Sequence, residues 1–292
     1  MESAALGQRD HPRVRRSAPL DLALAALAAQ TYPDHLMEVI VVDDGSTPPL
    51  RLPEIAPSGT RIEVADPSGW GTANAVNTGA ALSEGRIIQR LDSDMVVCRE
   101  HIEALARWHH LADYLVTIGA KKFIEEPDLS AARVYDGVRT SPLESVFDLS
   151  GALPSSTERT IQRTNGLRAS RNPYHVCTGP TVSMLRETFQ AVGGVDPSVL
   201  RGEDTEFAYR LAQRGVVFIP DPTAQAVHLG LPAQRLDKER TVRSVAPTSP
   251  SAFRSAVTCA RTGAAVAGAV RGGGAPRRRA LRPGAQGGER GS

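Results

Sequence analysis

Two apolar segments of the chain end in acidic residues. The sequence Asp43-Asp44-Gly45-Ser46 follows the apolar run 39–42, and Asp92-Ser93-Asp94 follows the apolar run 86–91. Strands of a parallel sheet gather their carboxyl ends at one edge, where ligands bind. Carboxylates accept hydrogen bonds from hydroxyls and bind hard divalent cations, which neutralise phosphate. The two acidic segments therefore predict a site for a hydroxyl-rich nucleoside joined to a metal-bound diphosphate.

Each acidic segment also has a plainer interpretation. Asp and Gly favour turns, so residues 43–46 alone predict a turn as readily as a binding site. The pattern Asp-x-Asp is common by chance in loops, and only its place after an apolar strand favours a ligand role. In the functional interpretation Asp94 binds the metal, while Asp92 faces the ribose or orients the cation.

A glycine-rich segment, residues 69–79, lies between the two acidic segments and leads into a predicted helix over 72–82. Glycines before a helix permit close approach of the backbone to a ligand, and the helix N-terminus favours an anion. The same composition is equally typical of a helix that packs closely through Ala and Gly. Asn77 is the polar residue of this helix that we expect to contact the nucleotide.

Glu203 and Asp204 open a second predicted helix, and His228 follows 24 residues after Asp204. Acidic residues in a first turn suit the helix dipole, which is a purely structural explanation. A carboxylate at the mouth of a cleft can also act as a general base. A lone histidine is more often structural than a ligand, but His228 follows the apolar strand 216–219 and a loop, with Asp221 nearby. This position favours metal binding by His228.

Strand and helix patterns alternate along the chain, which predicts an α/β fold. The alternation pauses over residues 121–174, a polar, irregular segment that we expect to cover the substrate side of the sheet. The predicted domains are a disordered segment at 1–16, a globular domain at 17–240 and a low-complexity basic tail at 241–292. Within the globular domain, residues 17–120 form the nucleotide-binding half and residues 121–240 the acceptor half.

Composition is that of an ordinary soluble protein, with 292 residues, 41% hydrophobic and 23% charged. Residues 250–292 contain eight Arg and one Glu, a net charge of +7, so the rest of the chain carries −5. The three cysteines, Cys98, Cys177 and Cys259, form no CxxC pair and fit a reducing cytoplasm. No signal peptide or membrane-spanning run is recognisable, which predicts a cytoplasmic location.

The basic tail predicts weak electrostatic contact with polyanions. Weak peripheral contact with the inner face of a membrane is the expected form. A disordered basic tail binds nucleic acid without specificity, so no specific nucleic-acid partner is expected.

The order VVDDGS, Gly/Asn-rich helix, LDSD, GGVD, GED and a final His resembles that of family 2 glycosyltransferases of the GT-A fold, over about residues 20–230. The resemblance implies a Rossmann-like, mostly parallel sheet with helices on both faces. It implies a nucleotide-diphospho-sugar donor, a divalent cation (Mn²⁺ or Mg²⁺), and a glycan, lipid-linked or small-molecule acceptor. The implied activity is transfer of the sugar to an acceptor hydroxyl.

The same resemblance implies roles for particular residues. Asp44 contacts the base with Asp43 beside it, and Asp94 holds the metal with His228. Asp204 is the expected catalytic base of a direct, inverting displacement. Glu203 faces the acceptor, and the turn 177–179 lies near the sugars.

The chain also departs from the family pattern. Members begin with a strand like VxVxIPTYNR, whereas residues 1–16 of this chain contain no apolar strand, and Val76 stands where Arg is frequent. An alternative is therefore a catalytically impaired or truncated sugar-nucleotide-binding protein. Nucleotidyl transfer is less favoured, because no glycine-rich loop with Lys or Arg follows the first strand. Membrane-docking helices are not recognisable after His228, which favours single transfers over polymer synthesis.

Overall fold

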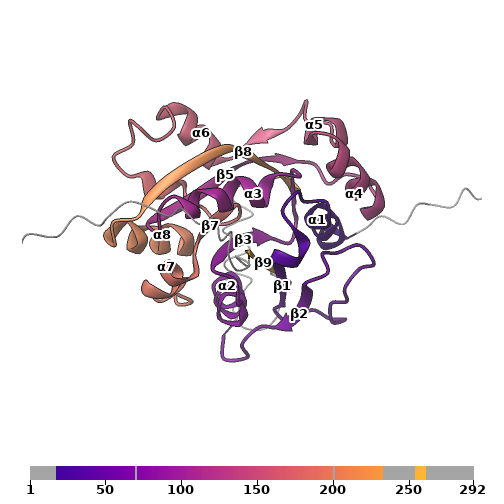
Figure 1. Ribbon diagram of the computed structural model, residues 1–292, viewed down its shortest axis with the longest axis horizontal. Helices are drawn as coiled ribbons and strands as arrows, with labels where there is room; N and C mark the ends of the chain where they lie inside the picture. The colour runs from indigo at the N-terminus through magenta and orange to yellow at the C-terminus, as the bar shows by residue number, and fades with distance from the viewer. Residues whose placement is uncertain (1–17, 70, 200, 233–253, 261–292) are drawn as a thin grey trace, which may run out of the picture. The chain divides into compact units, whose positions relative to one another are not determined.

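A computed structural model describes residues 18–69, 71–199, 201–232 and 254–260, which fold around one nine-stranded sheet (Figure 1). The strand order is β2-β1-β9-β3-β7-β5-β8-β4, and β6 pairs with β5. The strands are β1 (Met37–Asp43), β2 (Thr60–Val64), β3 (Ile87–Asp92), β4 (Met95–Val97), β5 (Leu115–Ile124), β6 (Leu153–Pro154), β7 (Val182–Leu185), β8 (Val217–Leu229) and β9 (Arg254–Ala260).

The sheet is mixed. Only the β1–β2 and β5–β8 pairs are parallel, and the other six pairings are antiparallel. The expectation of a mostly parallel sheet therefore needs correction for strand pairing, because antiparallel β9 and β7 lie between strands of the other direction. Strand direction nevertheless matches the prediction: β1, β2, β3, β5 and β8 all run the same way. The carboxyl ends of β1 and β3 thus share one edge.

Helices complete an α/β arrangement, which confirms the predicted class. They are α1 (Pro19–Ala28), α2 (Gly71–Leu82), α3 (His101–Ala106), α4 (Ala131–Thr140), α5 (Leu143–Val146), α6 (Ser156–Arg163), α7 (Arg186–Ala191) and α8 (Glu203–Gln213), with short 3₁₀ turns η1 (Asp34–Leu36), η2 (Arg107–His110) and η3 (Pro173–Val176). No helix in the described ranges has the length and hydropathy needed to cross a bilayer.

Alternate residues of β1 show how helices cover both faces of the sheet. Val39 and Val41 belong to the core cluster that contains the leucines of α1, whereas Ile40 and Val42 pack with Ala75 of α2. All four side chains are fully buried. This is the burial expected when both faces of a strand are covered.

The segment 121–174 is more regular than the sequence indicates. It contains the end of β5, the helices α4, α5 and α6, and the short strand β6. Side-chain caps explain where two of the helices begin: Ser130 Oγ accepts from Arg133 N, and Ser155 Oγ accepts from Glu158 N. These helices are short, and few of their residues are buried.

Strand β8 is also longer than predicted, and it carries His228 itself instead of ending before a loop. Its register against β5 shifts between Gly119 and Ala120, so that Asp221 faces Gly119 while Gln225 faces Ala120. The unpaired residues 222–224 begin with Pro222, which has no N–H to donate, and the ladder resumes at Gln225.

The predicted boundary at residue 240 fails for one segment. Residues 254–260 were expected to lie in a disordered tail, but they form β9 within the sheet. The sequence of this segment has neither a clear alternating nor a continuous apolar pattern. Pairing with β1 on one side and β3 on the other stabilises it as a strand. The expectations for residues 1–16, for the rest of 241–292 and for membrane contact by the tail concern residues outside the described ranges.

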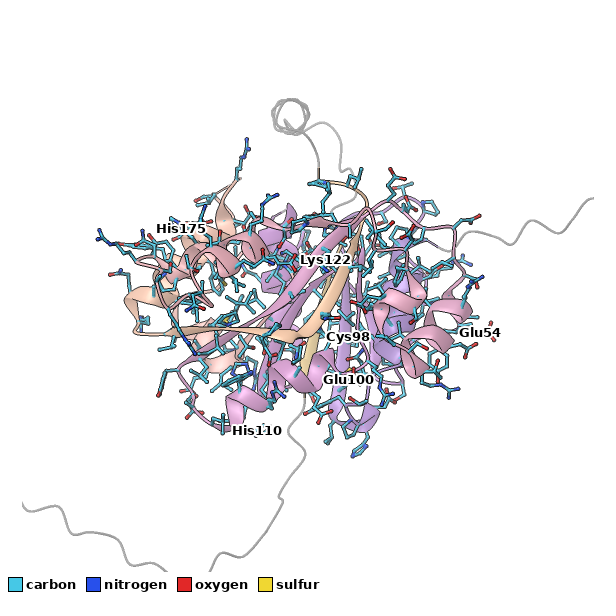
Figure 2. All side chains as sticks on the ribbon, turned by 90° about the horizontal axis from the view of Figure 1, so that it is seen from above. Glu54, Cys98, Glu100, His110, Lys122 and His175 are labelled. Atoms are coloured by element: carbon cyan, nitrogen blue, oxygen red, sulfur yellow. The ribbon has the colours of Figure 1, made fainter. Side chains whose placement is uncertain are left out.

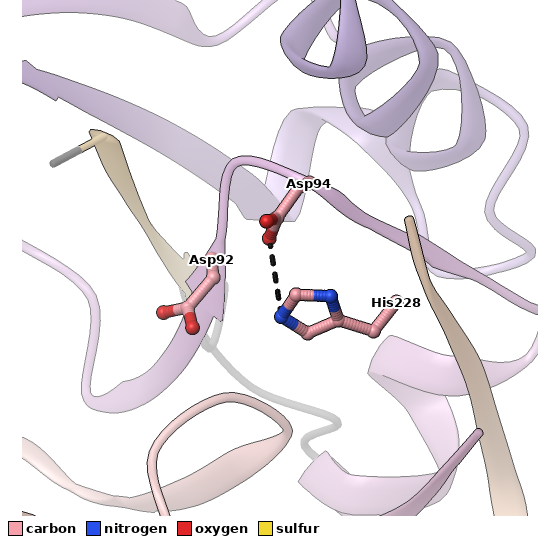
Figure 3. Close-up of side chains that lie close together, drawn as sticks. All are labelled: Asp92, Asp94 and His228. Carbon is pink, nitrogen blue, oxygen red and sulfur yellow. Dashed lines mark ion pairs between the residues drawn. The ribbon is translucent and has the colours of Figure 1, made fainter. Parts of the chain in front are cut away.

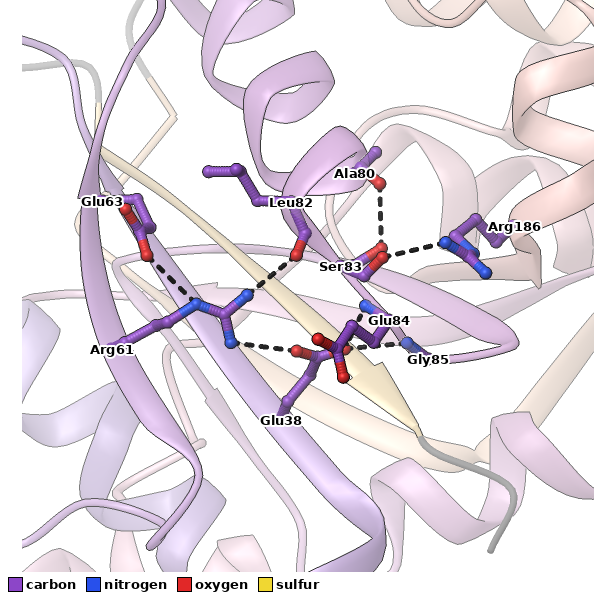
Figure 4. A network of polar contacts seen from close by, with 9 residues as sticks. All are labelled: Glu38, Arg61, Glu63, Ala80, Leu82, Ser83, Glu84, Gly85 and Arg186. Carbon is purple, nitrogen blue, oxygen red and sulfur yellow. Dashed lines mark hydrogen bonds and ion pairs between the residues drawn. The ribbon is translucent and has the colours of Figure 1, made fainter. Parts of the chain in front are cut away.

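Glu38 is the buried charge at the start of β1, and its side chain is 2% exposed (Figure 4). Its carboxylate accepts hydrogen bonds from Arg61 Nη1 at 3.0 Å, Glu84 N at 2.6 Å and Gly85 N at 2.8 Å. Burial alone would raise the pKa of Glu38, but these hydrogen bonds outweigh burial and the pKa is lowered. Arg61 also donates to the carbonyl of Leu82, so the network joins β1, β2 and the end of α2.

Replacing Glu38 by Ala should lower the free energy of unfolding by about 2–3 kcal/mol, because it leaves two backbone N–H groups without their acceptor. Glu63→Ala removes a more exposed partner of Arg61 and should cost less than about 1 kcal/mol. Urea unfolding at pH 7 measures both values, and equal losses would show that the buried Glu38 stabilises the fold no more than the exposed Glu63 does. Since the folded pKa of Glu38 is depressed, its contribution is present above the ordinary carboxyl pKa of about 4.3 and declines as pH falls through the lower folded value.

Candidate active site

The two acidic segments lie at one edge of the sheet, on either side of β9. In the strand register, Asp43 at the end of β1 faces Arg254, and Asp92 at the end of β3 faces Ser255. Adjacent strands are about 4.8 Å apart, so β1 and β3 are separated by roughly 10 Å. The predicted convergence of the two segments at one edge is therefore present in the structure.

Asp43 and Asp44 have different surroundings. The carboxylate of Asp43 accepts from Ser46 N at 2.8 Å and from Leu50 N at 3.1 Å, so it shapes the loop after β1. Asp44 Oδ2 instead accepts from Gly71 N at 2.7 Å, at the first residue of α2. Burial raises the pKa of Asp44 despite this hydrogen bond. Asp44 is thus the acidic residue that connects the β1 edge to the N-terminus of α2.

Asp92, Asp94 and His228 form a compact group (Figure 3). One potential ligand atom from each lies within 4.8 Å of the others, and His228 Nε2 is 3.6 Å from Asp94 Oδ1. The pairing of β4 with β8 creates this proximity, because Met95 faces His228 and Leu229 N donates to Asp94 O at 2.9 Å. The structure thus brings together the predicted metal ligands Asp94 and His228, with Asp92 beside them.

The chemistry of this group fits a divalent cation. Asp92 Oδ1, Asp94 Oδ1 and His228 Nδ1 are buried and accept or donate no hydrogen bond among the described residues. Burial raises the pKa of Asp94, and the neighbouring Asp92 adds to the effect. Carboxylate oxygen suits Mg²⁺ and Mn²⁺, whereas imidazole suits transition metals, so Mn²⁺ is compatible with all three ligands.

Glu203 and Asp204 begin α8, directly after Gly202, which has φ of +81°. Asp204 lies against the turn that contains Gly179, where φ is +71°. A Cβ at position 179 would come within 3.1 Å of Asp204 Oδ2 and 3.3 Å of Arg90 Nη2. Glycine at this position therefore permits the close approach of a carboxylate and a guanidinium. Burial raises the pKa of Glu203, and the adjacent Asp204 raises it further.

Two cations, the partly buried Arg90 and the buried Lys121, lie between the Asp92 side of the site and the Asp204 side, and neither was predicted from the sequence. Arg90 Nη2 is 3.7 Å from Asp92 Oδ1, and the Arg90 side chain is 13% exposed. Lys121 Nζ donates to the carbonyls of Thr178 at 2.7 Å and Pro180 at 3.3 Å. The one feature of the sequence that could have indicated either residue is a basic residue within a mostly apolar strand.

Lys121 interacts electrostatically with carboxylates on both sides of the site, those of Asp92 and Asp204. Burial lowers the pKa of Lys121 to about 8, while Asp92 and Asp204 act in the opposite direction. The next residue, Lys122 of β5, is labelled in Figure 2 and faces Val227 of β8. Alternation along the strand turns Lys121 to the other side, toward the turn at 178–180.

Asn77 occupies a different place from the one expected. Its Nδ2 donates to Val195 O at 2.7 Å, and its Oδ1 accepts from Val195 N at 2.9 Å. Both ends of the amide thus bind the backbone after the Gly193-Gly194 turn. This pairing supports a structural role in joining α2 to the segment that precedes α8, and does not support contact with a nucleotide.

Comparisons with known proteins agree with this architecture. The family model "Glycosyl transferase family 2" matches residues 14–193, more than half of the chain. The pre-mycofactocin glycosyltransferase of Mycobacterium tuberculosis is 30% identical over 195 residues, covering 66% of this chain and 37% of that protein. The hyaluronan synthase of Pasteurella multocida is 26% identical over 244 residues, covering 77% of this chain and 24% of the synthase.

Validoxylamine A glucosyltransferase of Streptomyces hygroscopicus subsp. limoneus is 26% identical over 215 residues, covering 70% of this chain and 47% of that enzyme. The chain therefore spans less than half the length of each of these three relatives. A crystal structure of GalNAc-T7 with UDP, GalNAc and Mn²⁺ superposes with a TM-score of 0.48 at 16% identity, covering 77% of this chain and 42% of the other. From the family match and the α/β sheet that carries the acidic residues, we conclude that the chain belongs to glycosyltransferase family 2 and has the GT-A fold.

Proposed function

We propose that the protein transfers a sugar from a nucleotide-diphospho-sugar to an acceptor hydroxyl, with a divalent cation bound by Asp92, Asp94 and His228. The observation that carries the proposal is this group of three, in which Asp92 Oδ1 and Asp94 Oδ1 are buried without hydrogen-bond partners among the described residues and His228 Nε2 faces Asp94. A protein interior leaves such atoms unsatisfied mainly where an ion or ligand completes them. The names of the relatives support transfer of sugars as the type of reaction.

The donor fits between the two acidic segments. Asp44 lies on the side where a nucleoside would be held, next to the N-terminus of α2. Its carboxylate can accept hydrogen bonds from the base. A cation at Asp92, Asp94 and His228 would neutralise the diphosphate as the sugar leaves. The roughly 10 Å between β1 and β3 is a suitable span for a nucleoside with its first phosphate groups.

Asp204 is the residue proposed to accept the proton. Its carboxylate lies beside Gly179, close to Arg90, and Lys121 contributes a second positive charge. A carboxylate in this position can take a proton from an acceptor hydroxyl. Attack by that oxygen on the face opposite the diphosphate would invert the anomeric carbon. Glu203 has a raised pKa and is suited to hydrogen bonding with the acceptor.

A direct screen of candidate acceptors can identify the class of molecule that receives the sugar. The relatives are named for pre-mycofactocin, hyaluronan and validoxylamine A, and the present chain shares at most 30% identity with the three. Glycan, lipid-linked and small-molecule acceptors are therefore the classes to compare. Helices α4, α5 and α6, which follow β5, are the elements proposed to select among them.

Replacing Asp94 by Ala should weaken Mn²⁺-dependent binding of a nucleoside diphosphate by at least about 10-fold, because it removes a metal ligand and leaves Asp92 and His228 alone. Calorimetry with UDP, GDP and dTDP, each with Mn²⁺ and with EDTA, measures the effect. Asp113→Ala is the matched control, since the Asp113 side chain is exposed and its carboxylate pairs with Arg86. Equal affinity of Asp94→Ala and wild type would exclude Asp94 as a ligand.

Replacing Asp204 by Asn should reduce the rate of transfer by about 10²–10⁴-fold, because the amide cannot accept the proton. Donor affinity should stay within about threefold, since the shape is kept. Glu206→Gln on the same helix is the control, because Glu206 pairs with Arg210 and should affect transfer little. Chromatography follows the nucleoside diphosphate that is released and the sugar that is transferred to the acceptor. Transfer that is undetectable in wild type, with Mn²⁺-dependent binding intact, would instead support the binding-only alternative.

A further inference from the structure

Strand β9 joins the two strands that carry the acidic residues. Its seven residues pair with β1 on one side, and six of them pair with β3 on the other, antiparallel in both cases. The order β2-β1-β9-β3 shows that β1 and β3 do not pair with each other. The C-terminal segment of the described chain is therefore the backbone connection between the Asp43–Asp44 side and the Asp92–Asp94 side.

The facing edges of β1 and β3 need a partner. Residues 39–42 of β1 are fully buried, and Ile87 and Ile88 of β3 are buried too. Backbone N–H and C=O groups in such surroundings are nearly always hydrogen-bonded, because an unpaired buried group costs free energy. An open position between β1 and β3 would leave one row of these groups unpaired on each strand. An extended segment between them is thus a structural requirement.

The width of the site depends on the same segment. One strand between β1 and β3 fixes their separation at two strand spacings, roughly 10 Å. Direct pairing of β1 with β3 would halve this distance and bring the two acidic segments together. Without any pairing, no backbone hydrogen bonds would hold the two sides in register.

We propose that residues 254–260 are a required part of the donor site, because β9 sets the distance and register between the Asp44 side and the Asp92–Asp94 side. This segment lies outside the family match at residues 14–193. Its effect on the donor rests on the proposed function, whereas its place between β1 and β3 does not. Helix α2, which receives the Asp44 hydrogen bond through Gly71, packs against both β1 and β9.

Hydrogen–deuterium exchange of the full-length chain tests the position of β9 without any ligand. Peptides that cover residues 254–260 should exchange at least about 100-fold more slowly than the same sequence as a free peptide. Peptides from β1 and β3 should be protected together with them, because the three strands share hydrogen bonds. Exchange of residues 254–260 at the rate of the free peptide would overturn the proposal.

A proline in β9 tests its effect on the site. Val257 faces Ile40 of β1 and Arg90 of β3, so its N–H donates to one of these strands and Val257→Pro removes that bond. Val270→Pro is the matched control, in the segment after β9. The β9 variant should melt at least about 5 °C lower and bind UDP–Mn²⁺ at least about 10-fold more weakly, while the control matches wild type.

The results separate the two proposals. If Val257→Pro matches Val270→Pro in melting temperature, the role of β9 is refuted. If the β9 variant melts lower but keeps wild-type affinity for UDP–Mn²⁺, the role in the donor site is refuted. If wild type binds no nucleoside diphosphate with Mn²⁺, the proposed function fails, and hydrogen–deuterium exchange still decides whether β9 holds β1 and β3 together.

Discussion

Repulsion between neighbouring carboxylates is the constraint on which this site depends. Asp92 and Asp94 lie together, and Glu203 and Asp204 are adjacent. Burial raises the pKa values of Asp94 and Glu203, and the neighbouring carboxylate raises each of them further. Buried carboxylates are stable in such pairs only where positive charge or protons compensate for them. Arg90 and Lys121 supply one positive charge each near these pairs, and a divalent cation would supply two more. Binding of a divalent cation would therefore balance the charge of these carboxylates.

The fold brings these groups together through backbone pairing more than through side-chain contacts. Pairing of β4 with β8 places His228 beside Asp94, although the two are distant in sequence. Pairing of β9 with both β1 and β3 aligns the two acidic segments at one edge. The absence of a side chain at Gly179 then allows both Asp204 and Arg90 to lie close to this turn. These backbone features determine where the charged side chains lie, and the charged side chains would carry out the chemistry.

Prediction from sequence was effective where local patterns were strong. The apolar run at 39–42 and the acidic residues after it correctly indicated β1 and its edge, and the order of motifs correctly indicated the family. It was weaker where long-range pairing decides. Residues 254–260 have no strong pattern, and they become a strand because β1 and β3 both offer unpaired edges. Asn77 looked like a ligand because its partner, Val195, is 118 residues away.

The residues of the site were likewise predicted where a local pattern indicated them, and missed where burial in the folded chain decides. Asp94 and His228 were correctly expected to lie together, since both follow or end apolar strands. Arg90 and Lys121 were not predicted as site residues, because a basic residue within a strand is usually exposed and the sequence does not show when it is buried. The roles of Asp43, Asp44, Asp204 and Glu203 stay predictions that depend on the function proposed above.

Pulsed electron paramagnetic resonance of Mn²⁺ bound to the full-length chain with UDP tests the central claim most directly. Nitrogen from a coordinating imidazole modulates the Mn²⁺ signal, and the nuclei of carboxylate oxygen do not. The structure predicts one bound Mn²⁺ per chain with nitrogen modulation that disappears in His228→Ala. Absence of bound Mn²⁺, or nitrogen modulation that is unchanged in His228→Ala, would contradict a metal site formed by Asp92, Asp94 and His228.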